Sequence, residues 1–237
     1  MRPIQLLFAL AGAAVLMGAP MQALANHCVA PIEWGEGFAY ETDYAGKISN
    51  PGSVLTIVST VNCFSGIFGV IGDPDGSKEY SVIVTGGTSL GTTVTNVPGP
   101  NYKIHQTTYL GATFQIYEDP SNNANFATAP GSFTDGTLFL DGTIDSIFVT
   151  FTLTSTGAFF GGNFDAHDTG VLTGGSFFDS FGSPGSICQM NITGGWNPNA
   201  LDIPPGWSAD VAGKVDLADC VTQNESSTWG RLKALYH

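Results

Sequence analysis

Short runs of β-branched and aromatic residues alternate with polar residues along most of the chain, and turn-forming clusters interrupt these runs roughly every 8–12 residues. After the first 25 residues, no stretch shows the apolar period of 3.6 residues that a long helix requires. Alternation with a period of two is typical of strands that have one face buried. We therefore predict an all-β fold, an antiparallel β-sandwich of the jelly-roll type, with a β-barrel as the alternative.

The individual strands are predicted from alternating runs bounded by Gly, Pro, Asn or Asp. The predicted ranges are 38–44, 54–61, 79–85, 92–97, 102–109, 112–118, 137–144 and 147–154, with further strands around 158–164, 170–178 and 186–193. The segment 188–220 is rich in Pro, Gly and Trp and shows little alternation. We expect it to form a long wrap around the domain, followed by a short tail.

The stretch "FTDGTLFLDGTID", Phe133 to Asp145, contains three aspartates and two Asp-Gly pairs. If Asp145-Ser146 is the centre of a turn, Ile144 faces Ile147 and the remaining apolar residues of both flanking runs fall on one side. The pattern predicts a half-buried hairpin. In such a hairpin the three carboxylates are spread along the strands and do not converge on one metal ion.

The first 25 residues have the features of a secretory signal peptide. Arg2 supplies a positive charge, "IQLLFALAGAAVLMG" is apolar, and Ala23 to Ala25 form a small-x-small cleavage site. We expect Sec-type export, a mature chain that begins near Asn26 and forms one domain over 26–237, and a secreted or cell-surface location. No later apolar run approaches the roughly 18 residues of a transmembrane helix, so no transmembrane segment is predicted in the mature chain.

Charge limits the classes of partner. The net charge is −13 and only 11% of residues are charged, so the chain lacks the clustered Lys and Arg that bind nucleic-acid phosphates. No cofactor is expected. The expected partners are further copies of the chain, other surface proteins, or glycans.

Four cysteines follow the signal peptide, and an even number in an exported chain indicates two disulfides. Three connectivities are open. We favour Cys28–Cys63 and Cys188–Cys220, because each pair spans a comparably short segment. A zinc site is the alternative, but the spacing contains no C-x-x-C or H-x-x-x-H pattern.

Candidate ligand residues are few. In "NFDAHDTG", Asp165 and Asp168 offer two carboxylates in a predicted loop, which makes calcium the candidate metal and a solvated turn the alternative. Trp34 and Trp207 are candidates for stacking on sugar rings, with core packing as the alternative role. The sequence "GTSLG", Gly87 to Gly91, is followed by a strand-like run where a nucleophile elbow needs a helix. No catalytic residues are therefore assigned.

The signal peptide, the strands rich in Thr, Gly and Phe, and "FQIYEDP…FTDGTLFLDGTI" together resemble a group of exported bacterial all-β proteins. Anchored members of that group carry a PEP-CTERM or another variable C-terminal sorting tail. The likeness covers roughly residues 54–195, and this chain ends in "RLKALYH" in place of an anchor. The resemblance implies a secreted or surface-associated β-domain and supplies no catalytic residues.

Together these observations predict a non-enzymatic, exported structural or interaction protein of the cell surface or extracellular matrix that self-assembles. The alternative is a carbohydrate-binding module or a glycan-active enzyme, which the tryptophans and the exposed acids favour.

Overall fold

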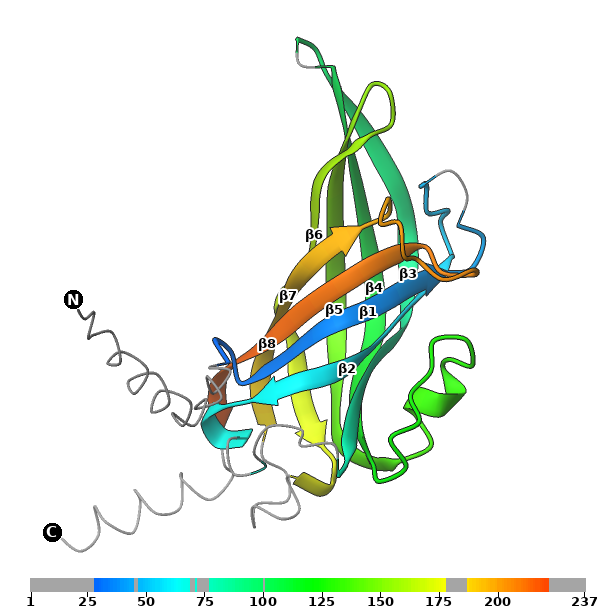
Figure 1. Ribbon diagram of the computed structural model, residues 1–237. Helices are drawn as coiled ribbons and strands as arrows, with labels where there is room; N and C mark the ends of the chain where they lie inside the picture. The colour runs from blue at the N-terminus through cyan, green and yellow to red at the C-terminus, as the bar shows by residue number, and fades with distance from the viewer. Residues whose placement is uncertain are drawn as a thin grey trace, which may run out of the picture.

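The computed structural model describes residues 28–44, 47–68, 71, 77–99, 101–177 and 187–221, and they form a closed antiparallel barrel of eight strands (Figure 1). The strands are β1 (Ile32–Glu41), β2 (Val54–Phe64), β3 (Glu79–Val97), β4 (Tyr102–Asp119), β5 (Thr137–Thr154), β6 (Phe159–Gly174), β7 (Ile187–Asn197) and β8 (Ala209–Val221). Each strand pairs with the next, and β8 pairs with β1. The all-β class is confirmed, and its arrangement is the barrel rather than the sandwich.

Strands β3 to β6 are much longer than the sequence predicted. Figure 1 shows β3 and β4 projecting beyond the other strands, with β5 and β6 following them for part of the way. The predicted pair 79–85 and 92–97 is one strand, β3, and the pair 102–109 and 112–118 is β4. The hairpin centred on Asp145-Ser146 was a wrong prediction, because β5 runs without a turn from Thr137 to Thr154.

A bend in the sheet explains this error. Ile144 and Ile147 are both buried although two residues separate them, so the inward-facing positions of β5 change phase at Asp145-Ser146. Directly opposite, β4 changes phase at Leu110-Gly111, where Gly111 has a φ of 70°. A glycine with positive φ lets a strand bend and turn its other side inward without leaving the sheet, and the β4–β5 register continues unshifted from Leu110 to Ala112. The phase change therefore marks a corner of the barrel.

The C-terminal segment is also part of the barrel. Residues 187–197 and 209–221 are strands β7 and β8, so the predicted irregular wrap over 188–220 was wrong. The disulfide Cys28–Cys63 is present and confirms that pairing. The backbone register places Ile187 opposite Val221 and Gln189 opposite Ala218, so the segments that contain Cys188 and Cys220 adjoin. The side chains of those two cysteines, the signal peptide and the C-terminal tail lie outside the described residues.

Large inward-facing side chains fill the barrel. The bulkiest fully buried ones include Trp196, Tyr109, Phe114, Phe164 and Leu140. Space for them depends on glycine: a Cβ at Gly213 would lie 2.5 Å from Cζ2 of Trp34, and one at Gly194 would lie 2.4 Å from Cε1 of Phe164. A filled interior is expected for an eight-stranded barrel. No helix among the described residues is long and apolar enough to cross a membrane.

A strap between β4 and β5, residues 120–136, covers part of the outer surface of the barrel. Its residues Phe126 and Phe133 pack in a second apolar cluster with Val58 and Ile83 of the barrel. The strap contains the short 3-10 helix η2 (Gly131–Phe133), and Ser81 Oγ donates a 2.7 Å hydrogen bond to the carbonyl oxygen of Phe133. A further 3-10 turn, η1 (Gly66–Phe68), follows β2.

Candidate functional site

A groove with a volume of about 410 Å³ crosses the outer surface of β2, β1, β8 and β7. Polar side chains border it, and glycines form much of its floor. The bordering side chains are Glu33, Asn62, Thr193 and Lys214, and the floor includes Gly35, Gly194 and Gly213. Its volume falls within the range of small-ligand sites.

The groove exists because the strands carry small residues and a bulge at this place. Strand β1 shifts register between Trp34 and Gly37 against both β2 and β8. A Cβ at Gly35 would lie 2.2 Å from Nδ2 of Asn62, so any larger residue there would displace the asparagine side chain. The absence of side chains on the floor leaves backbone and the Asn62 amide open to a ligand.

Glu33 and Lys214 border the groove with opposite charges. The two residues are directly opposite each other in the β1–β8 pair, yet no ion pair among the described residues joins them. Oε1 of Glu33 accepts hydrogen bonds from the backbone N–H groups of Val29 and Ala30, and Nζ of Lys214 lies 3.0 Å from Oδ2 of Asp216. Each of the two side chains therefore has a partner of its own at the border of the groove.

Trp34 forms part of the groove lining, but it belongs to the core. Only 3% of its surface is exposed, and its indole Nε1 has no hydrogen-bond partner. An indole buried to this extent offers no ring face to a sugar, which speaks against the stacking role expected for Trp34.

Trp207 lies in the connection between β7 and β8 and is half-buried. Its ring packs edge to face against Tyr40, at 5.7 Å, and Phe126, at 6.1 Å, and its Nε1 donates to the carbonyl oxygen of Phe126. Trp207 therefore fastens the strap to the barrel. Part of the ring of Trp207 remains accessible, so a glycan-binding role for this residue stays a prediction.

Asp210 lies directly opposite Phe38, and Phe38 packs against Trp207. Burial raises the pKa of Asp210, and the negative charges of Asp202 and Glu36 raise it further. An accessible aromatic edge beside carboxylates is a combination that can contact a polyhydroxylated ligand.

Asp165 and Asp168, the predicted calcium ligands, are in strand β6 and not in a loop. Asp165 pairs with Phe148 on one side and Thr193 on the other, and its Oδ1 is buried without a hydrogen-bond partner. The side chain of Asp168 lies outside the described residues. Within the described part of the chain, no three His, Cys, Asp or Glu side chains gather in a way that could hold a metal ion. Calcium binding stays a prediction.

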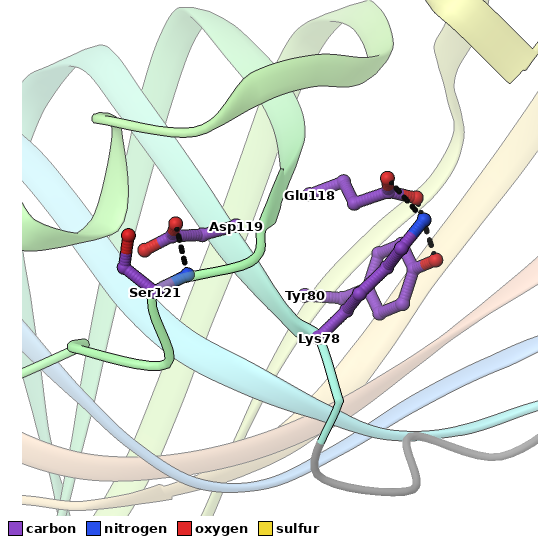
Figure 2. Close-up of polar contacts among 5 residues, drawn as sticks. All are labelled: Lys78, Tyr80, Glu118, Asp119 and Ser121. Atoms are coloured by element: carbon purple, nitrogen blue, oxygen red, sulfur yellow. Dashed lines mark hydrogen bonds and ion pairs between the residues drawn. The ribbon is translucent and has the colours of Figure 1, made fainter.

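Two adjacent acids at the end of β4 have different surroundings, as Figure 2 shows. Glu118 accepts hydrogen bonds from Nζ of Lys78 and Oη of Tyr80, each at 2.7 Å. Burial by itself would raise the pKa of Glu118, but these two hydrogen bonds and the charge of Lys78 outweigh it and lower the pKa. Asp119 points to the other side of the strand, and its Oδ1 accepts a hydrogen bond from the backbone N–H of Ser121 at 2.7 Å. These contacts fix the base of the β3–β4 pair.

A buried polar layer closes the opposite end of the barrel, and no local pattern in the sequence predicts it. Glu41 is only 7% exposed, and Oη of Tyr109 donates to its Oε1. Burial raises the pKa of Glu41, and this effect outweighs the opposing influence of the nearby hydroxyl groups of Ser49 and Tyr109. Oγ of Ser49 donates a hydrogen bond to Oγ of Ser89 at 2.7 Å, which ties the β1–β2 loop to β3.

Comparisons with known proteins were made on the whole chain. No family model matches it, no curated protein is significantly similar to it, and no solved structure matches it.

Proposed function

We propose that the protein is an exported structural or interaction protein of the cell surface or extracellular matrix that associates with further copies of itself. The observation that carries this proposal is the extended sheet formed by β3 to β6 beyond the barrel. One face of this extension buries Phe151 and Leu153, and its other face is a surface that it can present to a partner.

The outer face of this extension is uncharged over two rows of registered residues. One row is Thr93, Gln106, Thr150 and Asn163, and the next is Thr95, Ile104, Thr152 and Gly161. In a chain with a net charge of −13, such a face is where two copies repel each other least.

Exposed apolar side chains lie close to these rows. Leu110 and Phe148 are on neighbouring strands near the barrel corner, and Leu90 and Phe160 are exposed as well. Large exposed apolar residues gathered on one part of a surface are typical of protein contacts. They support association through the extended sheet.

Export is supported by the sequence of the first 25 residues and by the disulfide Cys28–Cys63. Structural disulfides form and persist in oxidising compartments outside the cytoplasm. Both observations agree with a role at the cell surface or in a matrix.

The proposal is tested by measuring the mass of the purified protein by light scattering over a wide range of concentrations. We expect the mean mass to rise with concentration, and we expect the double variant Leu110→Ser/Phe148→Ser to weaken this rise. Leu201→Ser is the matched control, because Leu201 is fully exposed in the β7–β8 connection, away from β3–β6. A strictly monomeric protein at all concentrations contradicts the proposal.

Carbohydrate binding is the second candidate function, and the groove between Glu33 and Lys214 favours it together with Trp207. A glycan array with the unmodified protein tests it. Lys214→Met alters only the groove, and Trp207→Ala alters only the aromatic group around Trp207. Comparing glycan binding by the two variants therefore shows which of the two sites binds. Trp34→Ala is unsuited to this test, since it removes a core side chain. An array without any binding contradicts this candidate.

A further inference from the structure

Three acids meet where the strap leaves the barrel and returns to it. Glu79 and Asp119 are directly opposite each other in the β3–β4 pair, and Asp135 lies at the far end of the strap, next to Gly136. A Cβ at Gly136 would lie 3.1 Å from Cα of Asp119, so the end of the strap is packed against its start. We name the group of Glu79, Asp119 and Asp135 the strap base.

Each acid of the strap base uses one carboxylate oxygen to accept a hydrogen bond from the strap. The pairs of acceptor and donor are Oε1 of Glu79 with the N–H of Ala124 at 2.9 Å, Oδ1 of Asp119 with the N–H of Ser121 at 2.7 Å, and Oδ2 of Asp135 with Nδ2 of Asn123 at 3.1 Å. The second oxygen of each carboxylate accepts no hydrogen bond from another described residue. The strap therefore closes around three carboxylates that each keep one oxygen for a further partner.

Asp119 is the most deeply buried of the three acids. Only 4% of its surface is exposed, and its Oδ2 is buried without a hydrogen-bond partner. Because directly opposite residues of an antiparallel pair share a face, the side chain of Asp119 lies on the face that Glu79 occupies. Lys78 is paired with Glu118 on the other side of the strand (Figure 2). A buried carboxylate oxygen requires a donor or a cation, and Oδ2 of Asp119 has neither among the described residues.

The negative charges at the strap base repel one another. Like charges that lie directly opposite each other destabilise an antiparallel pair, and Glu79 and Asp119 are such a pair. Burial raises the pKa of Glu79, the N–H of Ala124 opposes this effect, and the negative charges of Asp119 and Asp135 raise the pKa further. No Lys or Arg among the described residues forms an ion pair with any of the three acids. A divalent cation would offset the repulsion and give Oδ2 of Asp119 a partner.

We propose that the strap base binds a calcium ion, with Glu79 and Asp119 as its carboxylate ligands and with oxygen atoms of the strap and of water as its neutral ligands. No three acids among the described residues are gathered so that they could hold a metal by themselves. Asp135 is therefore a positioning residue, which holds the side-chain amide of Asn123 and adds negative charge. Calcium accepts irregular sets of carboxylate and neutral oxygens, whereas magnesium demands a nearly ideal octahedron.

This site would join β3 and β4 to the strap, whose Phe126 and Phe133 form the outer apolar cluster with the barrel. Two carboxylate ligands indicate weak binding, with a Kd of about 10⁻⁴–10⁻³ M as in extracellular calcium modules. The inference goes beyond the proposed function and is independent of self-association.

Isothermal titration of the purified, EDTA-treated protein with calcium chloride tests the site. Glu79→Gln and Asp119→Asn each keep the oxygen that accepts a hydrogen bond from the strap and remove one charge, so we expect either change to raise the Kd at least tenfold. Glu118→Gln is the matched control, because it removes the same charge from the adjacent position on the other side of the strand, and its Kd should change less than about twofold.

Three results overturn the proposal. The first is the absence of binding at about 10 mM calcium, which is tenfold above the weakest expected Kd. The second is an equal loss of affinity in Glu118→Gln, which indicates a diffuse charge effect. The third is binding that persists in both Glu79→Gln and Asp119→Asn, which places the ion elsewhere.

Thermal unfolding distinguishes a ligand of calcium from a residue that is only structural. Without calcium, Glu79→Gln removes the repulsion between facing carboxylates, so its melting temperature should be at least as high as that of the natural protein. With calcium at ten times the Kd, the natural protein should gain about 3–6 °C and the variant little, so the natural protein becomes the more stable of the two. A variant that is less stable by the same amount with and without calcium has lost a structural contact alone, and this result overturns the calcium site.

Discussion

Tyr109 of β4 and Glu41 of β1 meet inside the barrel, where the phenol oxygen donates a 2.5 Å hydrogen bond to Oε1 of the carboxyl group. The second carboxyl oxygen, Oε2, is buried and has no hydrogen-bond partner. Burial disfavours the charged form of a carboxyl group unless several donors surround it. The protonation of Glu41 therefore makes the stability of the barrel depend on pH.

The raised pKa of Glu41 predicts that its contribution to stability falls as pH rises. The unfolded carboxyl loses its proton near its ordinary value of 4.5, while the folded one still holds it, so the folded state binds more protons above that pH. Glu41→Gln removes this dependence. We expect the melting temperature of the variant, relative to that of the natural protein, to increase as pH rises from 4.5 to 8. Circular dichroism measures both melting temperatures. A constant difference over this range contradicts the prediction.

Glu118 predicts the opposite trend, because its pKa is lowered by Lys78 and Tyr80. Its favourable contribution is complete above the ordinary value of 4.5 and is lost as pH falls through the lowered pKa. Glu118→Gln should therefore cost stability at pH 7 and little at pH 3. The side chain is partly exposed, so we expect a change of less than about 1 kcal/mol, which high salt reduces further. Chemical denaturation at the two pH values measures it.

The presence of strands could be predicted from alternation alone, and most predicted ranges lie within β1 to β7. The strand lengths could not be predicted in this way, because Gly86, Gly91 and Gly111 are turn signals in a sequence. In this sheet Gly86 and Gly91 are bulges, and Gly111 is a point of positive φ within a continuous strand. Strand β8 was missed for a related reason. Its inward positions are Val211, Gly213 and Val215, and the glycine that makes room for Trp34 interrupts the apolar alternation.

The candidate sites were harder to predict than the fold. The groove joins Glu33 to Lys214, which are far apart in the sequence and become neighbours only when β8 closes onto β1. Glu41 follows an ordinary strand pattern, and its burial depends on a loop that folds over the barrel end through Ser49. Both features depend on long-range closure, for which the local sequence holds no signal.

The ring of Trp34 leaves no room for a side chain at Gly213. We therefore predict that alanine substitutions at Gly213 and at Gly195 differ greatly in their effect on stability. A Cβ at Gly213 would meet Cζ2 and Cε2 of Trp34 at 2.5 and 2.7 Å, whereas a Cβ at Gly195 meets nothing within 4 Å. We expect Gly213→Ala to lower the free energy of unfolding by roughly 1–3 kcal/mol, as overpacking does. Gly195→Ala is the control and should change it by less than about 0.5 kcal/mol. Equal effects in urea denaturation contradict the packing shown for Trp34.

The disulfide Cys28–Cys63 ties the start of the barrel to the end of β2 across a sequence separation of 35 residues. In the chain-entropy account, a closed loop of this length restricts the unfolded chain and stabilises the folded state by about 4 kcal/mol. The double variant Cys28→Ser/Cys63→Ser should lose a large part of this stability, which urea denaturation measures. Because Glu33 receives hydrogen bonds from Val29 and Ala30 next to Cys28, the same variant should also expose the N-terminal side of the groove to proteolysis. An unchanged unfolding midpoint together with unchanged protease resistance contradicts this role of the disulfide.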